Sequence, residues 1–259
     1  MAKKRPTILQ IIPELDTGGA ELSTIEIADA VESAGGRAIV LTKGGRLVQR
    51  LRDTGAQVRF FPAATKNPIQ LVWNVRRIAE IVRRYGVDLI HARSRAPAWS
   101  TLYAARRSGV PFVTTYHGAY GEKSALKHLY NSVMARGDVV IANSRYTAEL
   151  IRSRYGTPAK KIEVIYRGVD GALFDPALIA PERVAAVRSA WGIGEGERGV
   201  LQAARLTSWK GQNVLIEAAQ LLKAQGHLDN AVFILAGDAQ GRSAYKASLA
   251  GAIHAAGLE

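Results

Sequence analysis

The stretch "TILQIIPELDTGGAELS", residues 7–23, decides the fold class. It begins with a short β-branched apolar run, and two glycines, Gly18 and Gly19, then open a segment with apolar residues at helical spacing. A short apolar strand that leads through a turn into a helix is one βα unit. Repeated units of this kind build a parallel sheet with helices on both faces, so the stretch predicts an α/β fold.

The same alternation continues along the chain. Apolar runs predict strands at 7–12, 37–42, 57–61, 88–92, 111–116, 138–142 and 162–166. After "GVDGALFDP" (168–176) the pattern loosens into an acidic, Gly-rich connection. It restarts with strands at 199–204 and 231–236, a helix from about 212 and a last helix near 242–256.

A chain of 259 residues is long for a single core, so we expect two α/β domains, residues 1–170 and 171–259. The second domain would contribute two strands only. Two parallel strands leave a hydrophobic edge uncovered, which natural domains rarely tolerate. We therefore expect the sequence to be a fragment with a truncated second domain.

Composition limits the classes of function. The chain has no Cys, which excludes disulfides and thiolate metal sites and suits a reducing compartment. The apolar run at the start is short and broken by Pro13, so it is a first strand rather than a signal peptide. Residues 1–168 hold 27 Lys and Arg against 13 Asp and Glu, whereas residues 169–259 hold 8 against 9. The positive field of the first part attracts nucleic acid, acidic membrane surfaces or phosphorylated glycans.

Loops after the carboxyl ends of strands are where α/β sheets bind ligands. Gly18 and Gly19 would turn free helix N–H groups toward a phosphate or sugar, or they serve only the geometry of a turn. His117 follows the strand at 111–116 and can donate to an oxygen, although a lone His is often structural.

A further loop contains "LTSWKGQ", residues 206–212. Arg205 leaves the strand at 199–204, and Lys210 stands at the start of the next helix. Two cations beside a helix N-terminus suit a pyrophosphate, because they would otherwise repel each other. The alternative is a solvated pair of charges.

These segments together resemble the motif series of glycosyltransferase family 4, whose members are retaining enzymes of the GT-B fold. The series is, in order, "GGAE" (18–21), "HG" (117–118), "ANS" (142–144) with Thr147, "GVD" (168–170), "ARLTSWKG" (204–211) and "AGD" (236–238). The resemblance covers almost the whole chain. It implies two Rossmann-like domains facing across a cleft, the first for the acceptor and the second for a nucleotide-sugar donor.

The resemblance also implies roles for single residues. Arg205 and Lys210 would hold the donor diphosphate, Gly18 and Gly19 would lie against the phosphate and the transferred sugar, and His117 would line the reacting sugar as the catalytic residue. The positive pair would neutralise the leaving group, so neither a metal ion nor another cofactor is expected. Two features depart from the family: the sequence ends before an E-x7-E element, and Arg167 stands where members commonly have Asn.

The acceptor is inferred from charge. On a helix predicted at 67–86, four arginines form a stripe beside the apolar Ile69, Val72, Ile78 and Val82. This stripe consists of Arg76, Arg77, Arg83 and Arg84, and Arg93, Arg95, Lys123 and Lys127 add to it. It is either a solvated face or a surface for anionic lipid or a phosphorylated lipid-linked glycan. The pattern resembles bacterial enzymes that extend lipopolysaccharide core, and predicts a cytoplasmic protein at the inner face of the membrane.

Three alternatives belong to other classes. A nucleic-acid-binding module would explain the basic half, but no recognition motif is visible, and we expect no nucleic-acid partner. A GT-B sugar-nucleotide epimerase needs acid and base carboxylates, for which Glu14, Asp16 and Glu21 are the candidates. A non-catalytic fragment would have an intact first domain and no affinity for a donor.

Overall fold

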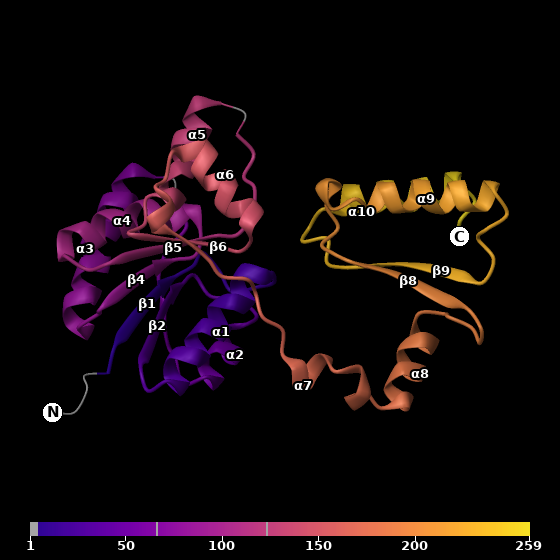
Figure 1. Cartoon of the computed structure of the whole chain (residues 1–259), viewed down its shortest axis with the longest axis horizontal. Coiled ribbons are helices and arrows are strands. Elements are labelled where there is room, and N and C mark those ends of the chain that lie inside the picture. The colour runs from indigo at the N-terminus through magenta and orange to yellow at the C-terminus, as the bar shows by residue number, and fades with distance from the viewer. Residues whose placement is uncertain (1–4, 66, 123) are drawn as a thin grey trace. The chain divides into compact units, whose positions relative to one another are not determined.

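The computed structural model describes residues 5–65, 67–122 and 124–259 and divides into two compact units, Met1–Gly168 and Val169–Glu259 (Figure 1). The sequence-based boundary lies two residues further on, after residue 170. Both units are α/β structures with parallel strands, which confirms the predicted fold class.

One parallel sheet forms the centre of the first unit. In the described residues it has seven strands in the order β3-β2-β1-β4-β5-β6-β7. Every predicted strand of this unit is present, with ends that differ by two residues at most. The bounds are β1 Thr7–Ile11, β2 Arg37–Thr42, β3 Gln57–Phe60, β4 Leu89–Ala92, β5 Phe112–Tyr116, β6 Val139–Ala142 and β7 Ile162–Val164.

Helices cover both faces of this sheet. Figure 1 shows α1 and α2 on one face and α3 and α4 on the other. The bounds are α1 Gly19–Ser33, α2 Val48–Asp53, α3 Pro68–Tyr85, α4 Arg95–Ser108, α5 Ala125–Ser132 and α6 Arg145–Tyr155, with short 3-10 turns at Val133–Ala135 and Ala159–Lys161. Helix α3 begins at a cap, because the Asn67 side chain accepts hydrogen bonds from the backbone N–H groups of Ile69 and Gln70 at 2.9 and 3.3 Å.

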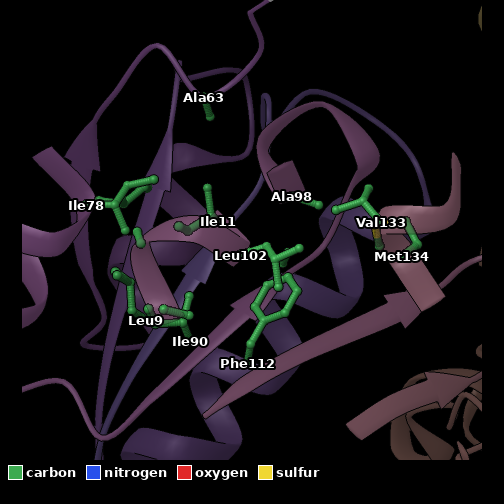
Figure 2. Close-up of a cluster of buried hydrophobic side chains, with 14 of the residues drawn as sticks. Leu9, Ile11, Ala63, Ile78, Ile90, Ala98, Leu102, Phe112, Val133 and Met134 are labelled. Atoms are coloured by element: carbon green, nitrogen blue, oxygen red, sulfur yellow. The ribbon is translucent and has the colours of Figure 1, made fainter. Parts of the chain in front are cut away.

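The larger core of the unit lies under α3 and α4. Alternate residues of β1 and β4, Leu9, Ile11 and Ile90, point to this face and are fully buried (Figure 2). Ile78 of α3 and Leu102 of α4 pack against them. A second cluster on the opposite face joins α1 and α2 to the sheet. Burial on both faces explains why the strands are almost continuously apolar.

Two aspartates fix neighbouring strands at their amino ends. The Asp88 carboxylate accepts a hydrogen bond from the Thr7 N–H at 2.8 Å, which joins β4 to β1. The Asp138 carboxylate accepts one from the Phe112 N–H at 2.9 Å, which joins β6 to β5. The backbone N–H of each aspartate donates back to the carbonyl of the same partner residue. These reciprocal pairs set the register of the central strands.

The second unit is built on a two-stranded parallel sheet in its described residues, β8 Arg198–Ala203 and β9 Ala231–Ala236. Helices α9 Gln212–Ala224 and α10 Ser243–Ala255 lie on one side of it and α8 Pro181–Ala190 on the other (Figure 1). The connection predicted to be irregular thus contains α8, preceded by α7 Gly171–Phe174 and a 3-10 turn at Pro176–Leu178. Pro181 and Glu182 in the first turn of α8 favour a helix at that position.

Candidate functional site

The order of the strands reverses between β1 and β4. The chain leaves β1 toward β2 and leaves β4 toward β5, so the loops after these strands diverge and open a crevice at the carboxyl edge of the sheet. Gly18 lies in the loop after β1, and Arg93 follows directly after β4. The fold therefore brings two predicted site residues to the position where parallel sheets bind ligands.

Gly18 and Gly19 lie at the start of helix α1, and the backbone at Gly18 favours glycine. Gly18 has φ 142°, a value that L side chains rarely adopt. A Cβ atom on Gly19 would overlap Nη1 of Arg167. The Arg167 guanidinium therefore lies directly against the first turn of α1.

A buried polar strip crosses the face of the sheet that carries α1. The Gln10 side chain donates to the carbonyl of Thr24 in α1 at 3.0 Å, and His91 Nε2 lies 2.7 Å from Thr115 Oγ1. Gln10 and His91 are register partners on β1 and β4. Burial and the nearby Arg93 guanidinium lower the pKa of His91 well below its usual value, so its imidazole is neutral.

The strip ends in a pocket of about 180 Å³ at the carboxyl edge. We call it the His117 pocket; its polar lining consists of Ser23, Glu26, Arg93, Thr115, His117, Asn143, Tyr166 and Arg167. Arg93 stands two residues after His91 and is 3% exposed. Its guanidinium donates to Ser23 Oγ, and its Nη1 lies 3.5 Å from His91 Nε2. Burial, followed by the charge of Arg167, lowers the pKa of Arg93 to about 10, which leaves it cationic at neutral pH.

His117 lines this pocket at the end of β5. Nη2 of Arg167 lies 2.9 Å from His117 Nδ1. Because a guanidinium only donates, Nδ1 is the acceptor, and the neutral ring carries its proton on Nε2. Burial and the charges of Arg93 and Arg167 lower the pKa of His117 to about 3. The Asn143 side chain donates to the His117 carbonyl at 3.1 Å, which fixes the backbone at the end of β5.

The predicted diphosphate loop belongs to the second unit. Arg205 follows β8 and is exposed, and its Nη1 lies 3.3 Å from Gln240 Oε1 in the loop after β9. Lys210 ends a 3-10 turn, and Gly211 with φ 82° leads into α9. The Gln212 side chain donates to the Arg205 carbonyl at 2.9 Å and holds the loop over the start of α9. Both cations thus stand at the carboxyl edge of β8, beside a helix N-terminus.

The predicted acceptor stripe is divided. Arg76, Arg83 and Arg84 of α3 are exposed, whereas Arg77 is half-buried and lies 4.9 Å from the ring centroid of Trp73. The apolar residues expected beside them do not share one surface. Ile69 and Val72 are exposed, but Ile78 and Val82 are buried in the core, because helical periodicity turns the second pair toward the sheet.

The other basic residues assigned to the acceptor side have different positions. Arg93 is buried in the His117 pocket rather than on an open loop. Arg95 begins α4, donates to Asn131 Oδ1 at 2.7 Å and lies 4.1 Å from the Tyr120 ring centroid. Lys127 is exposed on α5, and Lys123 lies outside the described residues.

Sequence reasoning did not place Arg167 in the site; it noted only a departure from the family at that position. A signal was available, because Arg167 closely follows β7 and the carboxyl ends of parallel strands share one edge. The pairing of His91 with Arg93 could also have been found, since residues two apart project from the same face of a strand.

Comparison with known proteins now identifies the family. Residues 17–172 match the model of Glycosyltransferase Family 4, which is more than half of the chain. The chain belongs to glycosyltransferase family 4. Residues 184–259 match a second model, Glycosyl transferases group 1. The two models together confirm the family suggested by the ordered motifs.

Solved glycosyltransferase structures share this fold. A glycosyltransferase from Rickettsia africae is 35% identical, covers 99% of this chain with a TM-score of 0.84, and is itself covered to 66%. Anabaena HepE in complex with UDP-glucose is 27% identical, with a TM-score of 0.81, 98% of this chain covered and 66% of its own. These likenesses confirm the GT-B type fold.

Curated relatives are less similar in sequence. The alpha-monoglucosyldiacylglycerol synthase of Streptococcus pneumoniae is 29% identical over 61% of this chain and 38% of its own length. A D-inositol 3-phosphate glycosyltransferase of Jonesia denitrificans is 26% identical over 81% of this chain and 55% of its own. The chain spans about half the length of the curated relatives that it matches.

In the described part of the chain, the His, Asp and Glu side chains form no group of three that could hold a metal ion. The helices in this part of the chain include none with the length and apolar character that crossing a bilayer requires.

Proposed function

We propose that the protein is a glycosyltransferase that moves a sugar from a nucleotide-sugar donor to a lipid-linked or lipopolysaccharide-type glycan, with retention of anomeric configuration. The observation that supports this proposal best is the loop from Arg205 to Gly211, which presents two cations beside the N-terminus of α9. A family relative with the same fold, HepE, binds UDP-glucose. The proposed donor is accordingly a nucleoside diphosphate sugar.

Arg205 and Lys210 have the chemistry to stabilise a departing diphosphate. Negative charge develops on the leaving group as the bond to the sugar breaks, and fixed cations and helix N–H groups favour that charge. In this proposal they perform the task that a divalent cation performs in other transferases. Activity in excess EDTA should therefore equal activity without it.

The first unit carries the proposed acceptor side. Its net charge of +14 attracts anionic surfaces, and Arg76, Arg83 and Arg84 are exposed on α3 to meet them. One family relative is named for a glucosylated diacylglycerol. We propose that the protein works at the cytoplasmic face of a membrane, where anionic lipids would hold it near a lipid-linked acceptor.

The test is transfer from a panel of nucleotide-sugars, using the whole protein that the gene encodes. Arg205→Ala and Lys210→Ala should each lower the rate at least tenfold while the fold is kept, since a charge-assisted contact contributes roughly 1.5–3 kcal/mol. Arg183→Ala and Lys246→Ala remove equally exposed cations of the same unit and should change little.

Full activity of Arg205→Ala or Lys210→Ala would refute the diphosphate assignment. Release of an epimerised sugar nucleotide, with no transfer to any acceptor, would favour the epimerase instead. Absence of donor binding would favour a non-catalytic role.

A further inference from the structure

The His117 pocket gathers hydrogen-bond donors and positive charge. Two guanidiniums line it, Arg93 and Arg167, and the neutral His117 ring adds an N–H group. Its single acidic lining residue among the described residues is Glu26, which is exposed on α1, as Arg167 is exposed after β7, so the two cations outnumber one carboxylate. The pocket thus has an excess of donors over acceptors.

Arg93 is incompletely paired. It is 3% exposed, yet it makes no ion pair among the described residues, and Ser23 and His91 are neutral partners. Its Nε is buried and has no hydrogen-bond partner in that part of the chain. Within that part of the chain, Glu26 is the one acidic group that acts on Arg93, without an ion-pair contact, and raises its pKa less than burial and Arg167 lower it. A buried charge with so weak a counter-charge is unfavourable, and so is a buried donor without an acceptor. An anion in the pocket would relieve both.

Besides Arg93 Nε, the described side chains of the pocket include a second buried donor without a full hydrogen bond, the Nε2–H group of His117. Its Nδ1 is engaged by Arg167, whereas Nε2 is buried and has no partner among the described residues. Interaction with the Arg93 backbone raises the pKa of His117, but less than burial and the two arginines lower it. The geometry of this interaction falls short of a full hydrogen bond to Nε2. An anionic acceptor would therefore compete for the Nε2–H group only with the weakly placed Arg93 backbone.

We infer that the His117 pocket binds an anionic oxygen group, a phosphate or a carboxylate, through Arg93, Arg167 and the Nε2–H of His117. A guanidinium offers paired donors that suit either group. The volume of about 180 Å³ is below the range of about 300–1,000 Å³ that is usual for whole small-molecule ligands. The pocket accordingly takes one group of a larger molecule.

This inference rests on the proposed function in one respect: it assigns the anionic group to a sugar substrate.

Arg167 is the residue that distinguishes the pocket. It contacts both the first turn of α1 at Gly19 and the ring of His117, so it couples the glycine turn to the imidazole. A shorter, uncharged side chain at this position would leave Arg93 as the single cation of the pocket.

The experiment measures binding to the whole chain by NMR of the His117 ring nitrogens. The probes are inorganic phosphate, and glucuronate with glucose as its neutral counterpart, because these two sugars differ in whether C6 is a carboxylate. Binding of phosphate or glucuronate should shift the Nε2 signal, whereas glucose should not. A bound anion should also raise the pKa of His117, since negative charge favours the imidazolium.

Arg167→Gln is the decisive variant, because this side chain is exposed and its removal leaves the core intact. We expect at least tenfold weaker binding of the anion. Arg93→Gln should act in the same direction, and its fold is checked by circular dichroism. Arg107→Gln, which removes an exposed charge of the same unit on α4, is the matched control and should bind normally.

Response to phosphate alone would assign the pocket to a phosphate group, and response to glucuronate alone to a sugar carboxylate. Absence of both responses at millimolar concentrations would overturn the inference. Unchanged binding in Arg167→Gln, or equal weakening in Arg107→Gln, would do so too. An assay of sugar transfer tests the proposed function separately. A protein that binds the anion through Arg167 but transfers no sugar would contradict the proposed function and leave the inference about this site intact.

Discussion

The two units use the same βα element and bury it to different extents. In the first unit, β1, β2, β4 and β5 have neighbours on both sides and helices on both faces, and most of their side chains are buried. In the second unit, Val200 and Leu201 of β8 are 36% and 49% exposed. The apolar runs "AIVLT" (38–42) and "GVLQAA" (199–204) are similar in sequence. Burial of a strand therefore depends on how many strands and helices adjoin it.

Charge divides the units in the same way. The basic excess lies entirely in the first unit, which also holds the buried His91 and the His117 pocket. The second unit is nearly neutral: its eight Lys and Arg residues are balanced by nine Asp and Glu.

Truncation of a core aromatic should give the largest difference. Phe112 is 2% exposed under α4, so Phe112→Ala should lower the free energy of unfolding by about 3–5 kcal/mol. Phe174→Ala makes the same change on a side chain that is 64% exposed in the second unit, and should cost less than about 1 kcal/mol. Urea unfolding measures both. Similar losses in the two variants would contradict the difference in burial.

Binding to membranes should give the second-largest difference between the two units. The double variant Arg76→Gln/Arg83→Gln should weaken sedimentation with anionic vesicles by about 2 kcal/mol, since each basic residue near such a surface contributes about 1 kcal/mol. Arg183→Gln/Arg198→Gln removes two exposed charges of the second unit and should have little effect. Raised salt should release the unmodified protein. Equal binding to neutral vesicles would show that the stripe is only a solvated face.

The histidines of the first unit should make its stability depend on pH. The pKa of His117 is about 3 in the folded chain, against about 6.5 when unfolded, so the unfolded state binds the extra proton. Stability should therefore fall as pH decreases from about 6.5 toward 3, by up to about 1.4 kcal/mol per pH unit. Urea unfolding at pH 7 and pH 5 measures this. His117→Gln should flatten the profile, and an unchanged slope would assign the loss to His91.

A helix cap should show the smallest effect. Asn67→Ala removes the acceptor for two backbone N–H groups at the start of α3 and should cost about 1 kcal/mol. Asp170 caps α7 in the same way, at 3.0 Å from the Ala172 nitrogen, but that helix buries no residue. Asp170→Ala should leave global unfolding unchanged. A larger effect of Asp170→Ala would mean that α7 has a greater role than its exposure indicates.

Sequence patterns located the strands because a short run of apolar, β-branched residues between turns is typical of a buried parallel strand. The runs at 37–42 and 231–236 coincide with β2 and β9. Side-chain placement was harder to predict. From the sequence, Arg93 was assigned to a basic surface, and Arg167 was noted only as a departure from the family. The order of the strands brings both side chains to His117. The glycine, histidine and diphosphate-loop roles remain predictions.

The carboxylates of Asp88 and Asp138 have a consequence for variation within the family. They secure the central strands at the amino edge, opposite to the edge that carries the His117 pocket. Substitutions and insertions in the carboxyl-edge loops therefore need not displace the strands beneath them. A change from asparagine to arginine at position 167, or a longer loop, can thus alter substrate binding while the sheet keeps its structure. The separation of anchoring from recognition makes this scaffold tolerant of new specificities.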